Sequence, residues 1–195
     1  MNFPDNTYFS SDMHFRHKNI IKYSNRPYAS IEEMQEGLIA NHNSRVRPQD
    51  WWFHLGDFAF APYEYIASIV KRLNGKKVML PGNHDNWEHL LKLKEAGLVD
   101  HVFRDWFGKI GNHRFHLYHF PIQSWEGAHH GTIHLHGHSH GSTTSPDMLR
   151  LDVGVDCHNW FPISYKEIAE WADTTLEKLK KKDVPLDPGR NRMHG

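Results

Sequence analysis

The chain has 195 residues, a mass of 22.9 kDa, and equal numbers of basic and acidic residues, 23 of each. This length fits a single domain, which we predict over residues 1–182, followed by a flexible tail over 183–195. The zero net charge gives no general attraction to nucleic acid or anionic membranes, and the single Cys157 excludes a disulfide framework or an all-cysteine metal cage.

Four helices are predicted from residues that favour a helix start. Ser30 begins a capping box with the glutamate three positions later, and Ser164 begins another. Between them, Pro62 and Asp85 open two further segments. Apolar residues at helical spacing follow each start, which predicts a buried face and no catalytic role.

Short runs rich in β-branched and aromatic residues alternate with these helices and predict strands. They cover residues 8–9, 51–55, 78–80, 102–107, 115–118, 132–135 and 149–155. The first half of the chain alternates strand and helix, and the second half is mostly strand. This order predicts an α/β fold with two sheets or one large mixed sheet, and with helices outside.

Membrane-spanning segments are not expected. The longest uninterrupted apolar run has four residues, 58–61, which is far too short for a transmembrane helix or a signal-peptide core. We therefore expect a cytoplasmic protein that does not bind a membrane.

Histidine is frequent, with 18 residues, and nine of them lie between His113 and His140. Imidazole is the commonest metal ligand in proteins. Five short groups of candidate ligands each follow a predicted strand: Asp12-Met13-His14, Gly56-Asp57, Gly82-Asn83-His84-Asp85, His119, and Gly137-His138-Ser139-His140. Ligands of open α/β sheets bind beyond the carboxyl ends of the strands, so we expect the five groups to converge. Each group alone occurs by chance, but together they predict a nitrogen and oxygen site for borderline to hard divalent metals.

In order and placement, these five groups resemble the calcineurin-like metallophosphoesterase superfamily. The pattern of that superfamily is D-x-H, G-D, G-N-H-[DE], H and G-H-x-H, and the runs at 11–15, 17–21 and 54–58 look like its compact bacterial and phage branch. The resemblance covers most of the chain, from Asp12 to His140. It implies a four-layer α/β/β/α fold, a two-sheet β-sandwich flanked by helices.

The resemblance also implies a role for each matching residue. It implies three ligands for a first metal ion: Asp12, His14 and His140. It implies three ligands for a second ion: Asn83, His119 and His138. Asp57 would bridge both ions, His84 would face the substrate, and Asp85 would orient His84.

A phosphoesterase of this type would hydrolyse phosphate esters by attack of a metal-bridging hydroxide. Two divalent ions about 3.5–4 Å apart neutralise the phosphoryl oxygens and lower the pKa of water. Among these ions Mn²⁺ is the first candidate, and Fe, Zn²⁺, Ni²⁺ and Mg²⁺ are alternatives. His84 would protonate the leaving alkoxide. The short segments between the groups leave little room for a specificity cap, which slightly favours phosphodiesters, including nucleotides, over phosphomonoesters.

Some residues depart from the pattern or flank it. Phe60 stands where some branches carry an acid or an amide, and Arg16 stands where many close relatives have Gly. Arg16 either holds a substrate phosphate through its forked donors or points to solvent. His17 and His54 are either substrate contacts or structural histidines.

A second hypothesis comes from another class of protein. Some members of the superfamily have lost ligands and serve as non-catalytic scaffolds that bind a protein partner. All seven inferred ligands and His84 are present in this chain, which favours the enzyme. Six tryptophans are candidates for stacking on a nucleotide base, although core packing is the better explanation for most: Trp51, Trp52, Trp87, Trp106, Trp125 and Trp160.

Overall fold

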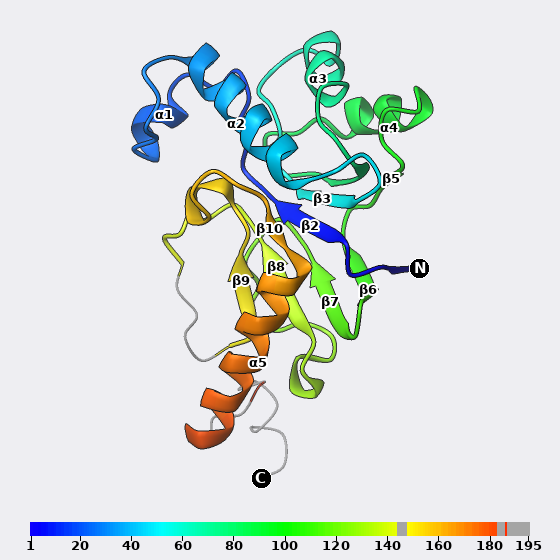
Figure 1. The fold of residues 1–195 in the computed structure, drawn as a ribbon, viewed down its shortest axis with the longest axis vertical. Coiled ribbons are helices and arrows are strands. Elements are labelled where there is room, and N and C mark those ends of the chain that lie inside the picture. Colours follow the sequence, from blue (N-terminus) through cyan, green and yellow to red (C-terminus); the bar gives the residue numbers. More distant parts are fainter. Residues whose placement is uncertain (144–147, 183–185, 187–195) are drawn as a thin grey trace.

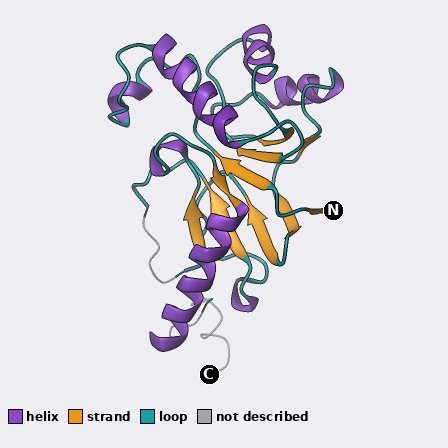
Figure 2. Ribbon diagram, in the orientation of Figure 1, coloured by secondary structure: helices purple, strands orange, loops and turns teal. Residues whose placement is uncertain are grey.

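Within the residues described by a computed structural model, ten strands build two five-stranded sheets. The description covers residues 1–143, 148–182 and 186. The predicted tail over 183–195 lies outside these residues except for Leu186, so its flexibility stays a prediction. Figure 1 follows the chain from its N-terminus, and Figure 2 separates the helices from the strands.

The first sheet, which we call the β3 sheet, has the order β10-β2-β3-β4-β5. Its strands are β2 (Thr7–Ser10), β3 (Trp51–Leu55), β4 (Lys76–Leu80), β5 (His101–Val102) and β10 (Ile163–Ser164). Strands β2 to β5 are parallel, and β10 pairs with β2 in the antiparallel sense at the edge.

The second sheet, which we call the β7 sheet, has the order β1-β6-β7-β8-β9. Its strands are β1 (Asn2–Phe3), β6 (Trp106–Ile110), β7 (His113–Leu117), β8 (Ile133–His136) and β9 (Arg150–Asp152). Strands β7, β8 and β9 are parallel, and β6 is antiparallel to β7. Both sheets therefore contain neighbouring parallel strands whose carboxyl ends lie at one edge.

Alternate residues of β3 point to opposite sides of the sheet and create two apolar cores. Phe53 and Leu55 belong to a core shared with Phe115 and Leu135 of the β7 sheet. Trp52 points the other way, into a core shared with helices. The two sheets therefore pack against each other, and helices cover the opposite face of the β3 sheet.

Five α-helices are described: α1 (Ile20–Tyr23), α2 (Ile31–Arg45), α3 (Tyr63–Val70), α4 (Trp87–Glu95) and α5 (Tyr165–Lys182). Helices α1 to α4 gather on the outer side of the β3 sheet in Figure 1, where Met34, Ile66 and Leu90 join the second core. Helix α5 differs, because Ile168 and Ala172 join the core between the sheets. Two short 3₁₀ helices complete the description: η1 (Ala128–His130) and η2 (Val155–Cys157). The α/β class with two sheets is confirmed, whereas the four-layer order stays a prediction.

Both predicted capping boxes form. The Ser30 hydroxyl accepts the N–H of Glu33 at 3.1 Å, at the start of α2. At the start of α5, the Ser164 hydroxyl accepts the N–H of Glu167 at 3.2 Å. The Glu167 carboxylate in turn accepts the N–H of Ser164 at 2.9 Å. Such reciprocal bonds satisfy donors that the first helical turn leaves unpaired.

The start of α4 differs from the prediction. Asn86, not Asp85, is the cap, and its side-chain oxygen accepts the N–H of Glu88 at 2.8 Å. This shift of one residue frees the Asp85 carboxylate for the loop that follows β3.

The predicted strand over 102–107 is wrong in one respect, because it is two strands in different sheets. β5 ends at Val102 in the β3 sheet, and β6 begins at Trp106 in the β7 sheet. Strands β1 and β10 and helix α1, each of two to four residues, were not predicted. Among the described helices, none combines the length and apolar character that crossing a membrane requires.

Candidate metal centre

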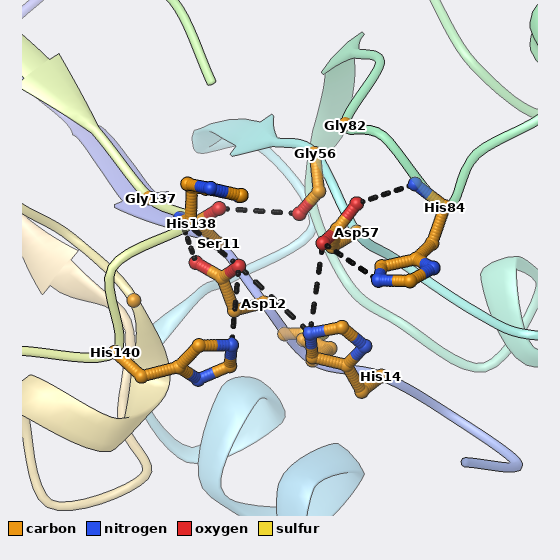
Figure 3. Close-up of polar contacts among 12 residues, drawn as sticks. Ser11, Asp12, His14, Gly56, Asp57, Gly82, His84, Gly137, His138 and His140 are labelled. Carbon is orange, nitrogen blue, oxygen red and sulfur yellow. Dashed lines mark hydrogen bonds and ion pairs between the residues drawn. The ribbon is translucent and has the colours of Figure 1, made fainter. Parts of the chain in front are cut away.

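Five loops bring the predicted groups together at one end of the two sheets. Asp12, Asp57 and Asn83 follow β2, β3 and β4, which are neighbouring parallel strands. His119 and His138 follow β7 and β8, which are neighbouring parallel strands of the other sheet. The N–H of His138 donates to both oxygens of the Asp12 carboxylate at 3.1 and 3.0 Å, which joins the sheets at the centre of Figure 3.

The first cluster consists of Asp12, His14 and His140, which offer ligand atoms within 4.8 Å of one another. His14 Nε2 and His140 Nε2 each lie 3.9 Å from Asp12 Oδ1. Asp12 and His14 are buried, and His140 is partly exposed. His14 Nε2 is buried and has no hydrogen-bond partner among the described residues.

The second cluster consists of Asp57, His119 and His138, with Asn83 beside them. The Asn83 side-chain oxygen lies 3.1 Å from His119 Nε2 and 3.0 Å from His138 Nδ1. The other ring nitrogen of His119 donates to the Leu55 carbonyl at 2.8 Å. In the neutral ring this leaves a lone pair on Nε2, which points at the oxygens of Asn83 and Asp57.

Asp57 lies between the two clusters. Its Oδ2 atom is 3.5 Å from His119 Nε2, 3.7 Å from His14 Nε2 and 4.0 Å from His84 Nε2. Its Oδ1 atom accepts the backbone N–H of His84 at 2.9 Å. Figure 3 shows the carboxylate between the His14 and His84 rings. This single carboxylate therefore faces ligands of both clusters.

The backbone of these loops is strained. Five candidate ligands have a φ between 46° and 67°: Asp12, His14, Asp57, His138 and His140. This left-handed conformation costs about 1–2 kcal/mol for each residue that is not glycine. Surrounding hydrogen bonds must hold it in place, such as those from the N–H groups of Asp12 and His14 to the carbonyls of Gly56 and Asp57, at 3.0 Å each. Strain of this kind concentrates at functional sites.

Two glycines of the motifs make room for the carboxylates. A Cβ atom at Gly82 would overlap the Asp57 carboxylate, and one at Gly137 would overlap the Asp12 carboxylate and the Ser11 hydroxyl. The loops after β4 and β8 therefore approach the acids as closely as a backbone can, which explains why glycine stands at these positions.

Burial away from water shifts the pKa values of the ionisable groups in the site. Burial raises the pKa of Asp12 from 3.8 to about 7, against the opposing charges of His119 and His140. Burial lowers the pKa of His14 from 6.5 to about 3. For Asp57, burial acts upward, but the hydrogen bond and charge of His119 hold its pKa below the usual range. Buried carboxylates beside imidazoles suit a bound cation, which would offset the cost of their burial.

Asp85 contacts the backbone instead of the His84 ring. Its two oxygens accept the N–H groups of Asp57 at 2.6 Å, Phe58 at 3.0 Å and Gly82 at 2.9 Å. Burial raises its pKa, and the N–H group of Gly82 opposes that rise. Asp85 therefore fastens the Asp57 loop to the Gly82 loop, and its role in orienting His84 stays a prediction.

Two residues that support the first cluster were missed by the sequence analysis. His140 donates from Nδ1 to Asp156 Oδ2 at 2.7 Å, and Arg26 grips the same carboxylate with bonds of 2.9 and 2.8 Å. The Arg26 guanidinium also donates to the carbonyls of Asp12 at 2.7 Å and Met13 at 2.9 Å. An acid just beyond the last predicted strand was the available signal for Asp156, and Arg26 gave none.

The three flanking residues have different surroundings. The exposed Arg16 guanidinium lies 5.2 Å from the centre of the Tyr65 ring, towards α3. The His17 ring lies beside the site, 5.4 Å from the His14 ring and 6.2 Å from the His84 ring. His54 is fully buried, and its Nδ1 accepts the N–H of Gly56 at 3.3 Å. Solvent does not reach His54, which favours the structural alternative.

Comparisons with known proteins add relatives whose function is unknown. The chain is 32% identical over 165 residues to the uncharacterized protein MJ1445 of Methanocaldococcus jannaschii, covering 80% of this chain and 85% of that protein. The crystal structure of AQ665, a protein of unknown function from Aquifex aeolicus, has a similar fold, with a TM-score of 0.65 and 23% identity. That match covers 85% of this chain and 98% of the Aquifex chain. No family model matches the chain.

Proposed function

We propose that this chain, which belongs to the same family as the archaeal protein MJ1445, is a two-metal-dependent phosphoesterase that prefers phosphodiesters. One observation carries the proposal. The carboxylate of Asp57 lies within 3.7 Å of both His119 Nε2 and His14 Nε2, so one acid serves both clusters. Two ions that share a carboxylate are typical of metal-assisted phosphoester hydrolysis.

The residues of both clusters fit divalent ions. His14 Nε2 is buried and unpartnered although two carboxylates lie within 4.0 Å of it. One ring nitrogen of His119 donates to the Leu55 carbonyl, and one of His140 donates to Asp156 Oδ2. The other ring nitrogen of each histidine faces a carboxylate. Lone pairs that converge in this way repel one another unless a cation lies between them. Imidazole, carboxylate and amide ligands suit Mn²⁺, Fe, Zn²⁺, Ni²⁺ or Mg²⁺, and we place Mn²⁺ first.

When bound, the two ions would neutralise the phosphoryl oxygens of the substrate and lower the pKa of the attacking water. The chain supplies the remaining functions. Asn83 contributes an uncharged oxygen, which keeps the site attractive to an anionic ester. The backbone N–H of His84 holds the Asp57 carboxylate in position at 2.9 Å.

His84 is the group that we assign to the leaving alkoxide. Its Nε2 atom lies 4.0 Å from Asp57 Oδ2, and its side chain is 39% exposed, so a substrate can reach it from solvent. In the hydrolysis, water forms the new bond to phosphorus, the bond between phosphorus and the leaving oxygen breaks, and the imidazole of His84 gives that oxygen a proton.

The same proposal extends to the architecture. Two packed sheets with α2 to α4 on the outer face of the β3 sheet support the metallophosphoesterase arrangement, although α5 packs into the core between the sheets. The second cluster is open to solvent, because Asn83 and His138 are exposed. An open site of this kind accommodates a diester, which has substituents on two sides of phosphorus.

The test is hydrolysis of a chromogenic phosphodiester and the matching monoester by metal-stripped protein refilled with Mn²⁺. The expected result is turnover that requires metal and favours the diester. Asp173→Asn, at a carboxylate on α5 that is 69% exposed, is the matched control and should behave like the natural protein. Stoichiometric metal binding with both esters intact would instead support the non-catalytic scaffold.

A further inference from the structure

 A groove opens beside His84 and belongs to neither cluster. Its volume is about 330 Å³. Its walls include Phe60, Ala61, Ile66, His84, Asn86 and His89. The groove therefore begins at the residue that we assign to the leaving group.

Aromatic side chains stand exposed at this side of the site. Phe60 is 59% exposed, and its ring lies edge-on to His84 at 5.8 Å between centroids and 5.6 Å from the His17 ring. Tyr23 is 75% exposed, and the centre of its ring lies 6.3 Å from the centre of the His17 ring. Large apolar rings that stay exposed next to a site indicate a ligand surface.

The six tryptophans considered from the sequence do not form this surface. Trp52, Trp106 and Trp125 are buried in the two cores, as core packing predicts. The stacking candidates beside the clusters are Phe60 and Tyr23, which the sequence analysis did not assign to stacking.

The chemistry of the groove selects an uncharged, flat group. None of the residues that line it is Asp, Glu, Lys or Arg. Its volume is at the lower end of the range for ligand pockets, about 300–1,000 Å³, which suits one ring system. A ring held there would stack on or pack against Phe60 while the phosphate lies at the clusters.

We propose that this groove is the leaving-group subsite and that it takes a flat aromatic group attached to the scissile oxygen. The inference rests on the proposed function, in which His84 gives its proton to that oxygen. Water attacks phosphorus, the bond from phosphorus to the leaving oxygen breaks, and the protonated aromatic alcohol leaves through the groove. Benzyl alcohols and nucleosides share this chemistry.

The kinetic test compares benzyl methyl phosphate with cyclohexylmethyl methyl phosphate. The two leaving alkoxides are similarly basic, but only the benzyl group has a flat ring. The metal-loaded protein should show a roughly tenfold higher kcat/KM for the benzyl ester, in keeping with stacking energies. Phe60→Ala should remove this preference, and Phe60→Trp should keep it. Phe107→Ala, at a ring that is 36% exposed on β6, is the matched control. Adenosine methyl phosphate, esterified at the 5′ oxygen, tests the nucleoside as the source of the ring.

A binding test separates this inference from the proposed function. Benzylphosphonate is added to the Mg²⁺-loaded protein, and the ring-proton resonances of His84 and His17 are followed by NMR, with cyclohexylmethylphosphonate as the comparison. The benzyl compound alone should shift them, and Phe60→Ala should abolish the shift. Shifts without hydrolysis of any ester would uphold the subsite and overturn the phosphoesterase. Hydrolysis without shifts or ring preference would overturn the subsite and leave the phosphoesterase intact.

Discussion

The first cluster is buried and braced, whereas the second is open. Asp12 and His14 have little contact with solvent, and Asp156 and Arg26 hold His140 and the Asp12 backbone in place. In the second cluster, Asn83 and His138 are exposed, and the one carboxylate, Asp57, is shared.

This contrast fits a site that holds one ion firmly and still admits a substrate. The first cluster has its own carboxylate, and Asp156 and Arg26 brace His140 and the Asp12 backbone, so it offers a more rigid frame. The second offers the neutral amide of Asn83 and a solvent-facing side. We expect the first cluster to bind its ion more tightly and the second to exchange its ion and receive the ester.

Replacing Asp57 should impair both clusters, because both lose the acid that they share. Asp57→Ala is expected to lower phosphodiester hydrolysis by roughly a thousandfold or more, since metal-assisted charge stabilisation is worth several kcal/mol. Metal content after desalting, measured by elemental analysis, should fall at both clusters. Retention of both ions with normal turnover would exclude the shared role of Asp57.

Replacing His84 should separate chemistry from metal binding. His84→Ala is expected to lower the rate by about 10²–10⁴, the usual contribution of a general acid, with both clusters still loaded. Steady-state kinetics and metal analysis on the same sample test this. Loss of metal without loss of rate would show that His84 is a ligand and not the proton donor.

Replacing Asp156 should weaken the first cluster alone. Asp156→Asn keeps the shape of the side chain but removes the charge behind His140, and we expect a ten- to hundredfold loss of affinity for the tighter ion, roughly the effect of losing such a supporting group. Calorimetric titration of the metal-free protein with Mn²⁺ resolves the two ions. Asn83→Ala is the matched variant and should weaken only the looser ion. Equal weakening of both ions by either variant would contradict the assignment of separate surroundings.

The smallest expected effect concerns the stability of the metal-free protein at acidic pH. It separates loss of the fold from loss of metal. His42 lies outside both clusters, and its burial lowers its pKa from 6.5 to about 4, although its bond to Asn74 opposes the shift. Between pH 6.5 and pH 4, His42 binds a proton in the unfolded chain but not in the folded chain. The free energy of unfolding therefore falls by roughly 3 kcal/mol as the pH drops through this range. Urea unfolding of metal-free protein at several pH values measures this, and His42→Gln should flatten the dependence by about one proton. An unchanged slope would mean that His42 does not contribute.

Local chemistry predicted the elements that carry their own start signals. The capping boxes at Ser30 and Ser164 and the apolar run of β3 are defined by neighbours in the chain, and they formed as expected. The run over 102–107 failed, because its composition is uniform while its two ends pair with different sheets. Strands β1 and β10 have two residues each, too few for a pattern, and exist because a neighbouring strand pairs with them.

The candidate ligands were predictable because each follows a strand, and parallel strands bring such residues to one edge. The ligand types, their order and their placement after β2, β3, β4, β7 and β8 follow from the amino-acid sequence alone. Three features became visible only in the folded chain: which ligands share a cluster, the bonds of Asp85 to the backbone, and the contact of Arg26 with Asp156 across 130 positions. Hydrogen bonds and burial depend on distances in space. When the partners belong to different sheets and helices, their spacing along the chain does not predict these distances.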